Sequence, residues 1–174
     1  MNSARTSFQL CVLALALVAL GACSTPAPPA PQPTRPDRDL VGEIRAAGSA
    51  TGSAIEVQPL RDPAVDGFVK QAGELEAAGK YNDAIGALDR ALKVAPDAPE
   101  LLQQKAELFI ALRQYDHAET LARKSFELGP KLGSLCARNW QTVVEVRRMA
   151  NDSVSVESAK AQLASCRIAP RVRM

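Results

Sequence analysis

Between residues 62 and 130 the chain shows one pattern of apolar and polar positions twice, with an offset of 34 residues. In each copy apolar residues recur three and four positions apart, the spacing that places them on one face of an α-helix. Small residues such as Ala84 and Ala91 stand where two helices would touch, and a proline closes each copy because it cannot continue a helix. The pattern predicts two consecutive helical hairpins. The matched positions are Ala72, Leu75, Tyr81, Ala84, Ala91, Leu92, Val94 and Pro96 in the first copy, and Ala106, Phe109, Tyr115, Ala118, Ser125, Phe126, Leu128 and Pro130 in the second.

A third, divergent hairpin is predicted after Pro130. Its first helix is expected over residues 134–150, where Leu135, Cys136, Trp140, Val143, Val144 and Arg147 have helical spacing. Asn151 begins a turn, and a second helix is expected to end near Cys166. Asp62 and Pro63 have the chemistry of a helix N-cap and first turn. We therefore expect an all-α domain over residues 62–168, followed by a basic tail over residues 169–174.

The repeated unit resembles the tetratricopeptide repeat. That family has a 34-residue period, small residues at helix contacts, a tyrosine near the turn and a proline at the end of each unit. Phe68 and Leu102 stand where the family often has tryptophan, and Arg113 stands where its turn glycine is expected. The resemblance implies about three stacked helical hairpins, the last of them divergent.

The N-terminal residues have the layout of an export signal. Arg5 is the only charged residue among the first 22, and it precedes an apolar run over residues 10–20 that is too short to span a bilayer. The run ends in Leu20-Gly21-Ala22-Cys23, which resembles the lipobox of bacterial lipoproteins. This resemblance implies that residues 1–22 are removed and that Cys23 carries lipid. Ser24 replaces the aspartate of inner-membrane retention, which implies an outer-membrane anchor facing the periplasm.

Residues 23–61 are expected to form a flexible tether between the anchor and the repeats. Six prolines lie between Pro26 and Pro36, and a stretch rich in Gly, Ala and Ser follows without a sustained helical or alternating pattern. The 38 residues after Cys23 could span about 125 Å at full extension. The fold class predicted from the sequence is thus tetratricopeptide-like hairpins after a disordered, proline-rich linker.

The remaining cysteines are expected to form a disulfide. Cys11 leaves with the signal and Cys23 is lipidated, so Cys136 and Cys166 remain in an oxidising compartment. The start of the first helix and the end of the second lie side by side in an antiparallel hairpin, and these two cysteines occupy those ends. The alternative is a pair of buried free thiols.

Composition and motifs argue against an enzyme and against nucleic acid as a partner. The chain has 21 Lys and Arg against 19 Asp and Glu, a net charge of only +2. His117, the single histidine, lies next to Asp116 at a helix start, and no nucleophile-base pair, metal site or phosphate loop has recognisable spacing. Glu74, Glu76 and Glu107 could imitate the paired carboxylates of a glycosidase. They are expected on ordinary solvated faces, so neither a cofactor nor a metal is predicted.

The tetratricopeptide resemblance also implies a ligand groove lined by the first helix of each hairpin. Four of the selected positions are Glu and none is Lys or Arg, which favours a basic or amide-rich protein segment as ligand. The alternative is that these charges only solvate the surface. Trp140 is either a packing residue of the third hairpin or an interface anchor. The expected groove positions are Val69, Gly73, Glu76, Glu100, Gln103, Glu107, Ile110, Gln141, Val144 and Glu145.

The lipid anchor, the tether and the repeat module together resemble the tetratricopeptide-type outer-membrane lipoproteins that activate bifunctional peptidoglycan synthases. The resemblance implies a protein partner, a class A penicillin-binding protein, and a role in cell-wall synthesis. One alternative is a scaffold lipoprotein of an envelope machine, such as outer-membrane barrel assembly or type IV pilus biogenesis. Another is direct wall binding through Arg167, Arg171 and Arg173.

Overall fold

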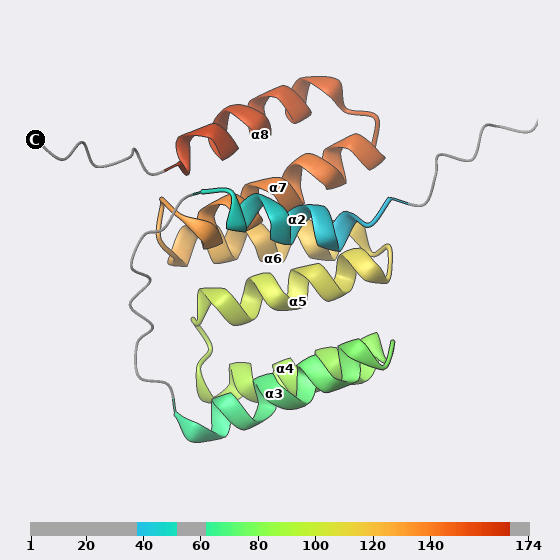
Figure 1. Cartoon of the computed structure of the whole chain (residues 1–174), viewed down its shortest axis with the longest axis vertical. Coiled ribbons are helices and arrows are strands. Elements are labelled where there is room, and N and C mark those ends of the chain that lie inside the picture. Colours follow the sequence, from blue (N-terminus) through green and yellow to red (C-terminus); the bar gives the residue numbers. More distant parts are fainter. Residues whose placement is uncertain (1–37, 52–61, 168–174) are drawn as a thin grey trace, which may run out of the picture. The chain divides into compact units, whose positions relative to one another are not determined.

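The described part of the chain, residues 38–51 and 62–167 of a computed structural model, is entirely helical (Figure 1). The predicted all-α class is therefore confirmed. Within these residues no helix has the length and apolar character needed to cross a membrane. The expected signal peptide, Cys23, most of the tether and the basic tail lie outside the described residues. The helices are α2 (Leu40–Ser49), α3 (Pro63–Ala77), α4 (Tyr81–Val94), α5 (Pro99–Ala111), α6 (Tyr115–Leu128), α7 (Ser134–Met149) and α8 (Ser153–Ser165).

Helices α3 to α8 form the three predicted hairpins. Each helix packs on its neighbour in the chain, so that α4 contacts α5 and α6 contacts α7 between hairpins. Alanines without exposed surface, including Ala84, Ala91, Ala118 and Ala122, lie where the helices approach each other. Close approach of two helices needs such small side chains at the contact. The small residues that recur with the period of 34 are thus found at the contacts between helices.

The first helix of every hairpin ends in the same way, including the divergent third one. Gly79, Arg113 and Asn151 follow these helices with positive φ angles of 71°, 58° and 56°. The next backbone N–H then donates to a carbonyl five residues back, as in the Schellman motif. These bonds are Lys80 N to Leu75 O at 2.8 Å, Gln114 N to Phe109 O at 2.8 Å and Asp152 N to Arg147 O at 3.0 Å. The common ending fixes the same reversal of direction in all three repeats.

Aspartates cap α3 and α8, the first and the last helix of the three hairpins. The Asp62 carboxylate accepts a hydrogen bond from Ala64 N at 2.8 Å, and Pro63 occupies the first turn of α3, as the sequence predicts. The Asp152 carboxylate accepts from Ser155 N at 3.1 Å at the start of α8. The hydrogen bonds from Ser155 lower the pKa of Asp152 below its ordinary value.

The tether expected over residues 23–61 is wrong in one segment. Residues 40–49 form helix α2, whose N-cap Asp39 accepts a hydrogen bond from Gly42 N at 2.8 Å. The helix packs on α7 and α5, so the described domain begins at Arg38 and not at Asp62. An isolated helix of ten residues is only marginally stable in water, and its sequence alone is a weak signal. Docking on the repeats supplies the missing stabilisation.

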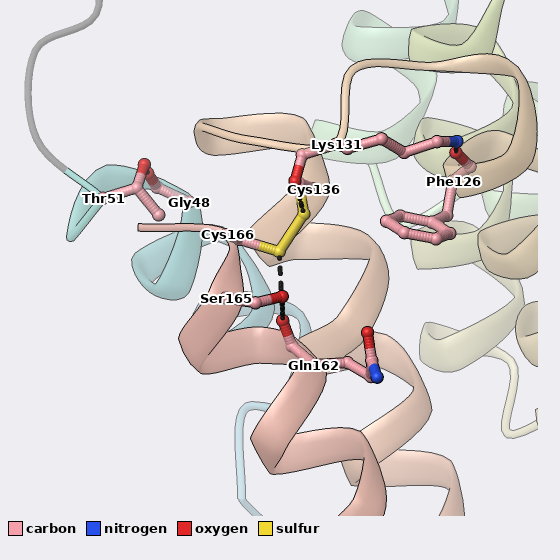
Figure 2. Close-up of a disulfide and its surroundings, with 8 residues drawn as sticks. All are labelled: Gly48, Thr51, Phe126, Lys131, Cys136, Gln162, Ser165 and Cys166. Atoms are coloured by element: carbon pink, nitrogen blue, oxygen red, sulfur yellow. Dashed lines mark hydrogen bonds between the residues drawn. A yellow bond between two sulfur atoms is a disulfide. The ribbon is translucent and has the colours of Figure 1, made fainter. Parts of the chain in front are cut away.

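Cys136 and Cys166 form the predicted disulfide (Figure 2). Both side chains are fully buried, and the bond joins the start of α7 to the end of α8. Beside it, Gly133 N donates to Cys166 O at 2.8 Å. The alternative of two free thiols is therefore wrong.

We expect the disulfide to contribute substantially to stability. It closes a loop with a sequence separation of 30 residues. The chain-entropy model gives about 3.5 kcal/mol for a loop of that length. A Cys136→Ala, Cys166→Ala double variant should lose about that much free energy of unfolding in urea titrations followed by circular dichroism. Wild-type protein in reductant is the control and should behave similarly; an unchanged midpoint in both would contradict the prediction.

Candidate interaction site on the inner face

Helix α2 lies on the side of the domain formed by the first helices of the hairpins. We call this side the inner face and define it by the residues of α3, α5 and α7 that α2 contacts. Arg38 lies near Glu145 toward the end of α7, whereas Gly48 lies against Ser134 and Arg138 at its start. Helix α2 therefore runs opposite to α7. The position of the expected groove is occupied by a segment of the chain itself.

The centre of this contact is apolar. Ile44 of α2 has no exposed surface and belongs to a buried cluster with Ile110 of α5 and Val146 of α7. Leu40 and Val41 are partly buried against the same cluster. Burial of a branched side chain of this size is worth about 1.5–3 kcal/mol relative to exposure. Ile44 is therefore the main apolar contact of α2 with the repeats.

Gly48 lets the C-terminal end of α2 approach α7 closely. A Cβ at this position would lie 2.8 Å from Arg138 Cγ and 2.9 Å from Ser134 Oγ. Contacts this short do not occur between real side chains, so a larger residue would require the side chains of Arg138 and Ser134, or the helices themselves, to shift. The glycine thus fits a specific surface of α7.

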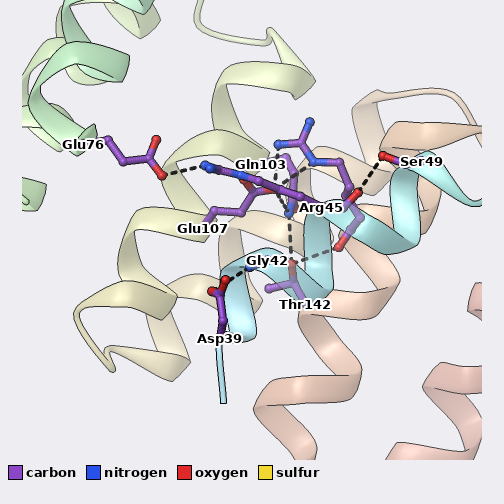
Figure 3. A network of polar contacts seen from close by, with 9 residues as sticks. Asp39, Gly42, Arg45, Ser49, Glu76, Gln103, Glu107 and Thr142 are labelled. Atoms are coloured by element: carbon purple, nitrogen blue, oxygen red, sulfur yellow. Dashed lines mark hydrogen bonds and ion pairs between the residues drawn. The ribbon is translucent and has the colours of Figure 1, made fainter. Parts of the chain in front are cut away.

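A buried carboxylate at the middle of the inner face joins α5 to α2 and α7. Glu107 of α5 has no exposed surface and accepts hydrogen bonds from Arg45 Nε at 2.8 Å and from Arg138 Nε at 2.8 Å. Gln103 Nε2 donates to the same carboxylate at 3.0 Å. Arg45 also reaches Glu76 of α3, with Nη2 2.7 Å from Oε1, and Figure 3 shows its guanidinium between the two carboxylates. One arginine of α2 is therefore held by two of the three repeats.

Electrostatics favours the charged form of that arginine. Burial alone would lower the pKa of Arg45, but the hydrogen bonds and charges of Glu107 and Glu76 outweigh it and leave the pKa raised. Such charge-assisted hydrogen bonds are stronger than neutral ones. The contact thus stabilises the charged guanidinium of Arg45.

A second ion pair holds the other end of α2. Glu145 of α7 is fully buried, and its Oε2 lies 3.2 Å from Arg38 Nη1. Its other oxygen accepts hydrogen bonds from Gln141 Nε2 at 2.5 Å and Arg148 Nη1 at 2.7 Å. Glu107 therefore has Arg45 of α2 as a partner, and Glu145 has Arg38, which directly precedes the N-cap of α2.

The predicted groove residues do not all lie on this face. Gln103, Glu107, Ile110 and Glu145 are buried. Glu107 and Glu145 therefore do not solvate the surface. Val69, Gly73, Glu76, Glu100 and Gln141 are partly exposed. Val144 packs with Val143 and with Ala159 of α8 in the core, so its assignment to the groove is wrong.

Trp140 is a packing residue of the third hairpin. Its ring lies edge-on to Phe126 with the centroids 5.0 Å apart, and it contacts both buried clusters between α7 and α8. The guanidinium of Arg123 lies over the ring, 5.6 Å from the centroid. This position agrees with the packing alternative stated above.

The sequence interpretation missed the cations of the inner face. Arg38 and Arg45 were placed in the tether, and Arg138 was not assigned to the groove. A signal was present, because Asp39 is followed by apolar residues at positions 40, 41 and 44, the spacing of a capped helix.

In the described ranges, no group of three or more His, Cys, Asp or Glu side chains could hold a metal ion.

Comparison with known proteins agrees with this geometry. A family model for the tetratricopeptide repeat matches residues 75–132, the part of the chain that contains α4, α5 and α6, and supports the interpretation of the hairpins as tetratricopeptide-like repeats. Its structure is similar to the globular C-terminal domain of Pseudomonas aeruginosa LpoP, with a TM-score of 0.53 and 26% sequence identity. The match covers 58% of this chain and 99% of the LpoP domain. No curated protein sequence matches the chain significantly.

Loss of the Glu107 carboxylate should destabilise the domain. A Glu107→Ala variant leaves Arg138 and Arg45 without their shared partner, and breaking a buried pair costs about 3–5 kcal/mol. Glu74→Ala is the matched control, since Glu74 is 68% exposed and 3.9 Å from Lys70. That exposed pair should contribute under about 1 kcal/mol. Urea unfolding of both variants tests the difference; equal midpoints would show that Glu107 is not a structural centre.

Replacement of Ile44 by a charged residue should release α2 without unfolding the repeats. An Ile44→Asp variant would bury an unpaired carboxylate among Ile110 and Val146, so the undocked state becomes favoured. We expect backbone hydrogen exchange in residues 40–49 to speed up at least about tenfold, while α3 to α8 keep their protection. Ala46→Asp, on the exposed side of α2, is the control with the same new side chain. Protection lost throughout the domain would contradict a separable α2.

Proposed function

We propose that this protein is a lipid-anchored activator of a bifunctional peptidoglycan synthase, a class A penicillin-binding protein, acting from the periplasmic side of the outer membrane. The observation that carries the proposal is the likeness of its repeat domain to the C-terminal domain of LpoP over almost the whole length of that domain. The sequence resemblance to lipoprotein activators of the tetratricopeptide type points the same way. In this proposal, the protein binds its partner and catalyses no reaction.

The architecture suits such a role. Leu20-Gly21-Ala22-Cys23 would place two or three acyl chains at the start of the mature chain, which makes membrane attachment effectively permanent. The repeat domain offers a scaffold with a disulfide and capped hairpins. A rigid binding surface at the end of a chain anchored in one membrane can meet an enzyme anchored in another, with an effective concentration set by the span between them.

The proposal predicts capture of a class A penicillin-binding protein. Full-length, tagged protein should be crosslinked mildly in the bacterium that produces it, purified and examined by mass spectrometry. We expect a class A penicillin-binding protein among the captured proteins, and a severalfold faster glycan polymerisation by that enzyme when the purified proteins are mixed. A Cys23→Ser variant separates partner contact from localisation. It should no longer be found in the membrane fraction, but it should still stimulate the enzyme in solution.

Other outcomes point elsewhere. Capture of barrel-assembly or pilus components without a penicillin-binding protein would replace the activator with a scaffold role.

Reversing the charges of the four glutamates expected in the groove is a poor control for this experiment. These residues are Glu76, Glu100, Glu107 and Glu145. Glu107 and Glu145 are fully buried, so their reversal would unfold the domain and abolish any contact.

A further inference from the structure

We propose that α2 is an internal ligand of the inner face, and that the protein partner presents an arginine-bearing helix of the same pattern which displaces it. The inference deepens the function proposed above and rests on it for the identity of the partner. In this view the domain has a closed form, with α2 docked, and an open form that binds the partner.

The contacts of α2 define what the inner face accepts. It provides an apolar contact formed by Ile110 and Val146, a buried carboxylate that binds the residue after Ile44, and a close approach to Ser134 and Arg138 of α7. In α2, Ile44 packs on the apolar contact, Arg45 pairs with the carboxylate and Gly48 approaches α7. The matching partner helix thus has a branched aliphatic residue, an arginine directly after it and a small residue four positions after the aliphatic one.

Charge makes this choice specific. When α2 leaves, Glu107 keeps Arg138 but loses Arg45, and Glu145 loses Arg38 from its Oε2 atom. An incoming helix must therefore bring one cation to Glu107 and a second one to Glu145, or leave a carboxylate with less compensation. An acidic or purely apolar helix would be rejected, because specificity here arises from charges that a wrong partner leaves unpaired.

Helix α2 is suited to leave. It has ten residues, two of them the glycines Gly42 and Gly48, and isolated helices of that length and composition do not persist in water. Its order therefore depends on docking, and the Arg45 side chain remains 44% exposed in the docked form. Segments of this kind occupy the low end of the range of local stabilities in a protein.

The competition can be measured with a synthetic peptide of residues 38–51 as the probe. Isotope-labelled full-length protein is titrated with the peptide to about 1 mM, near the effective concentration of a tethered ligand, and binding is followed by NMR. The apparent dissociation constant rises as the open fraction falls. We therefore expect the Ile44→Asp variant to bind the peptide at least about tenfold more tightly than wild type, at the signals of α5 and α7.

Matched variants isolate the cause. Ala46→Asp protein should behave as wild type, and a peptide with Arg45→Glu should bind the opened protein at least about tenfold more weakly, without any change to the folded domain. Gly48→Leu provides a second way to open the protein, should Ile44→Asp be poorly folded. Equal peptide affinity of wild type and both opened variants, or no binding to either opened variant, would overturn the proposal.

The same variants separate this inference from the proposed function. When the tagged protein is present in limiting amount, the Ile44→Asp variant should capture more of the class A penicillin-binding protein than wild type or Ala46→Asp. The peptide of residues 38–51 should reduce this capture. If the peptide binds as expected but no penicillin-binding protein is captured, the internal ligand stands and the activator role falls. If capture is equal in all variants, or lower in Ile44→Asp, the activator role stands and displacement of α2 is wrong.

Discussion

The negative charge of a carboxylate with no access to water must be compensated by cations and hydrogen-bond donors fixed around it. Glu107 is such a carboxylate in this domain. Its side chain is fully buried, yet it accepts hydrogen bonds from Arg45, Arg138 and Gln103. These partners come from α2, α7 and α5, and Arg45 extends the network to α3 through Glu76. The three repeats and the helix before them are thus linked by one network of charged side chains. Apolar packing between neighbouring helices stabilises each hairpin, and this network connects α2 to all three repeats through charge.

Sequence predicted those parts of the fold that a local or periodic signal specifies. The period of 34 residues follows from helix packing, and the cap at Asp62 and the disulfide follow from chemistry at neighbouring ends of helices. Helix α2 was missed because it occurs once, contains two glycines and follows a proline-rich segment that favours a linker interpretation. The charges of the inner face were misjudged for a related reason. Arg45 and Glu107 lie 62 positions apart, and no pattern in the sequence indicates a pair at that separation.

The divergent third hairpin keeps the geometry of the repeat by other means. Asn151 adopts the positive φ angle that Gly79 has in the first repeat, since asparagine tolerates this conformation better than most residues. The disulfide then fixes the start of α7 to the end of α8. Figure 2 shows Gly48 and Thr51, at the end of α2, in the surroundings of this bond. The part of α7 that receives Gly48 is therefore the part that the disulfide restrains, which keeps the surface for α2 in place.

Docking of α2 also changes the distance over which the domain could act. With a lipid anchor at Cys23, as proposed, a docked α2 leaves residues 24–37 between the membrane and the folded domain, a span of at most about 50 Å. With α2 released, the connecting segment covers residues 24–61 and could span about 125 Å. A partner helix that takes the place of α2 would therefore lengthen the connection at the moment of binding. If α2 docks and undocks as proposed, one equilibrium controls both access to the inner face and the reach of the domain.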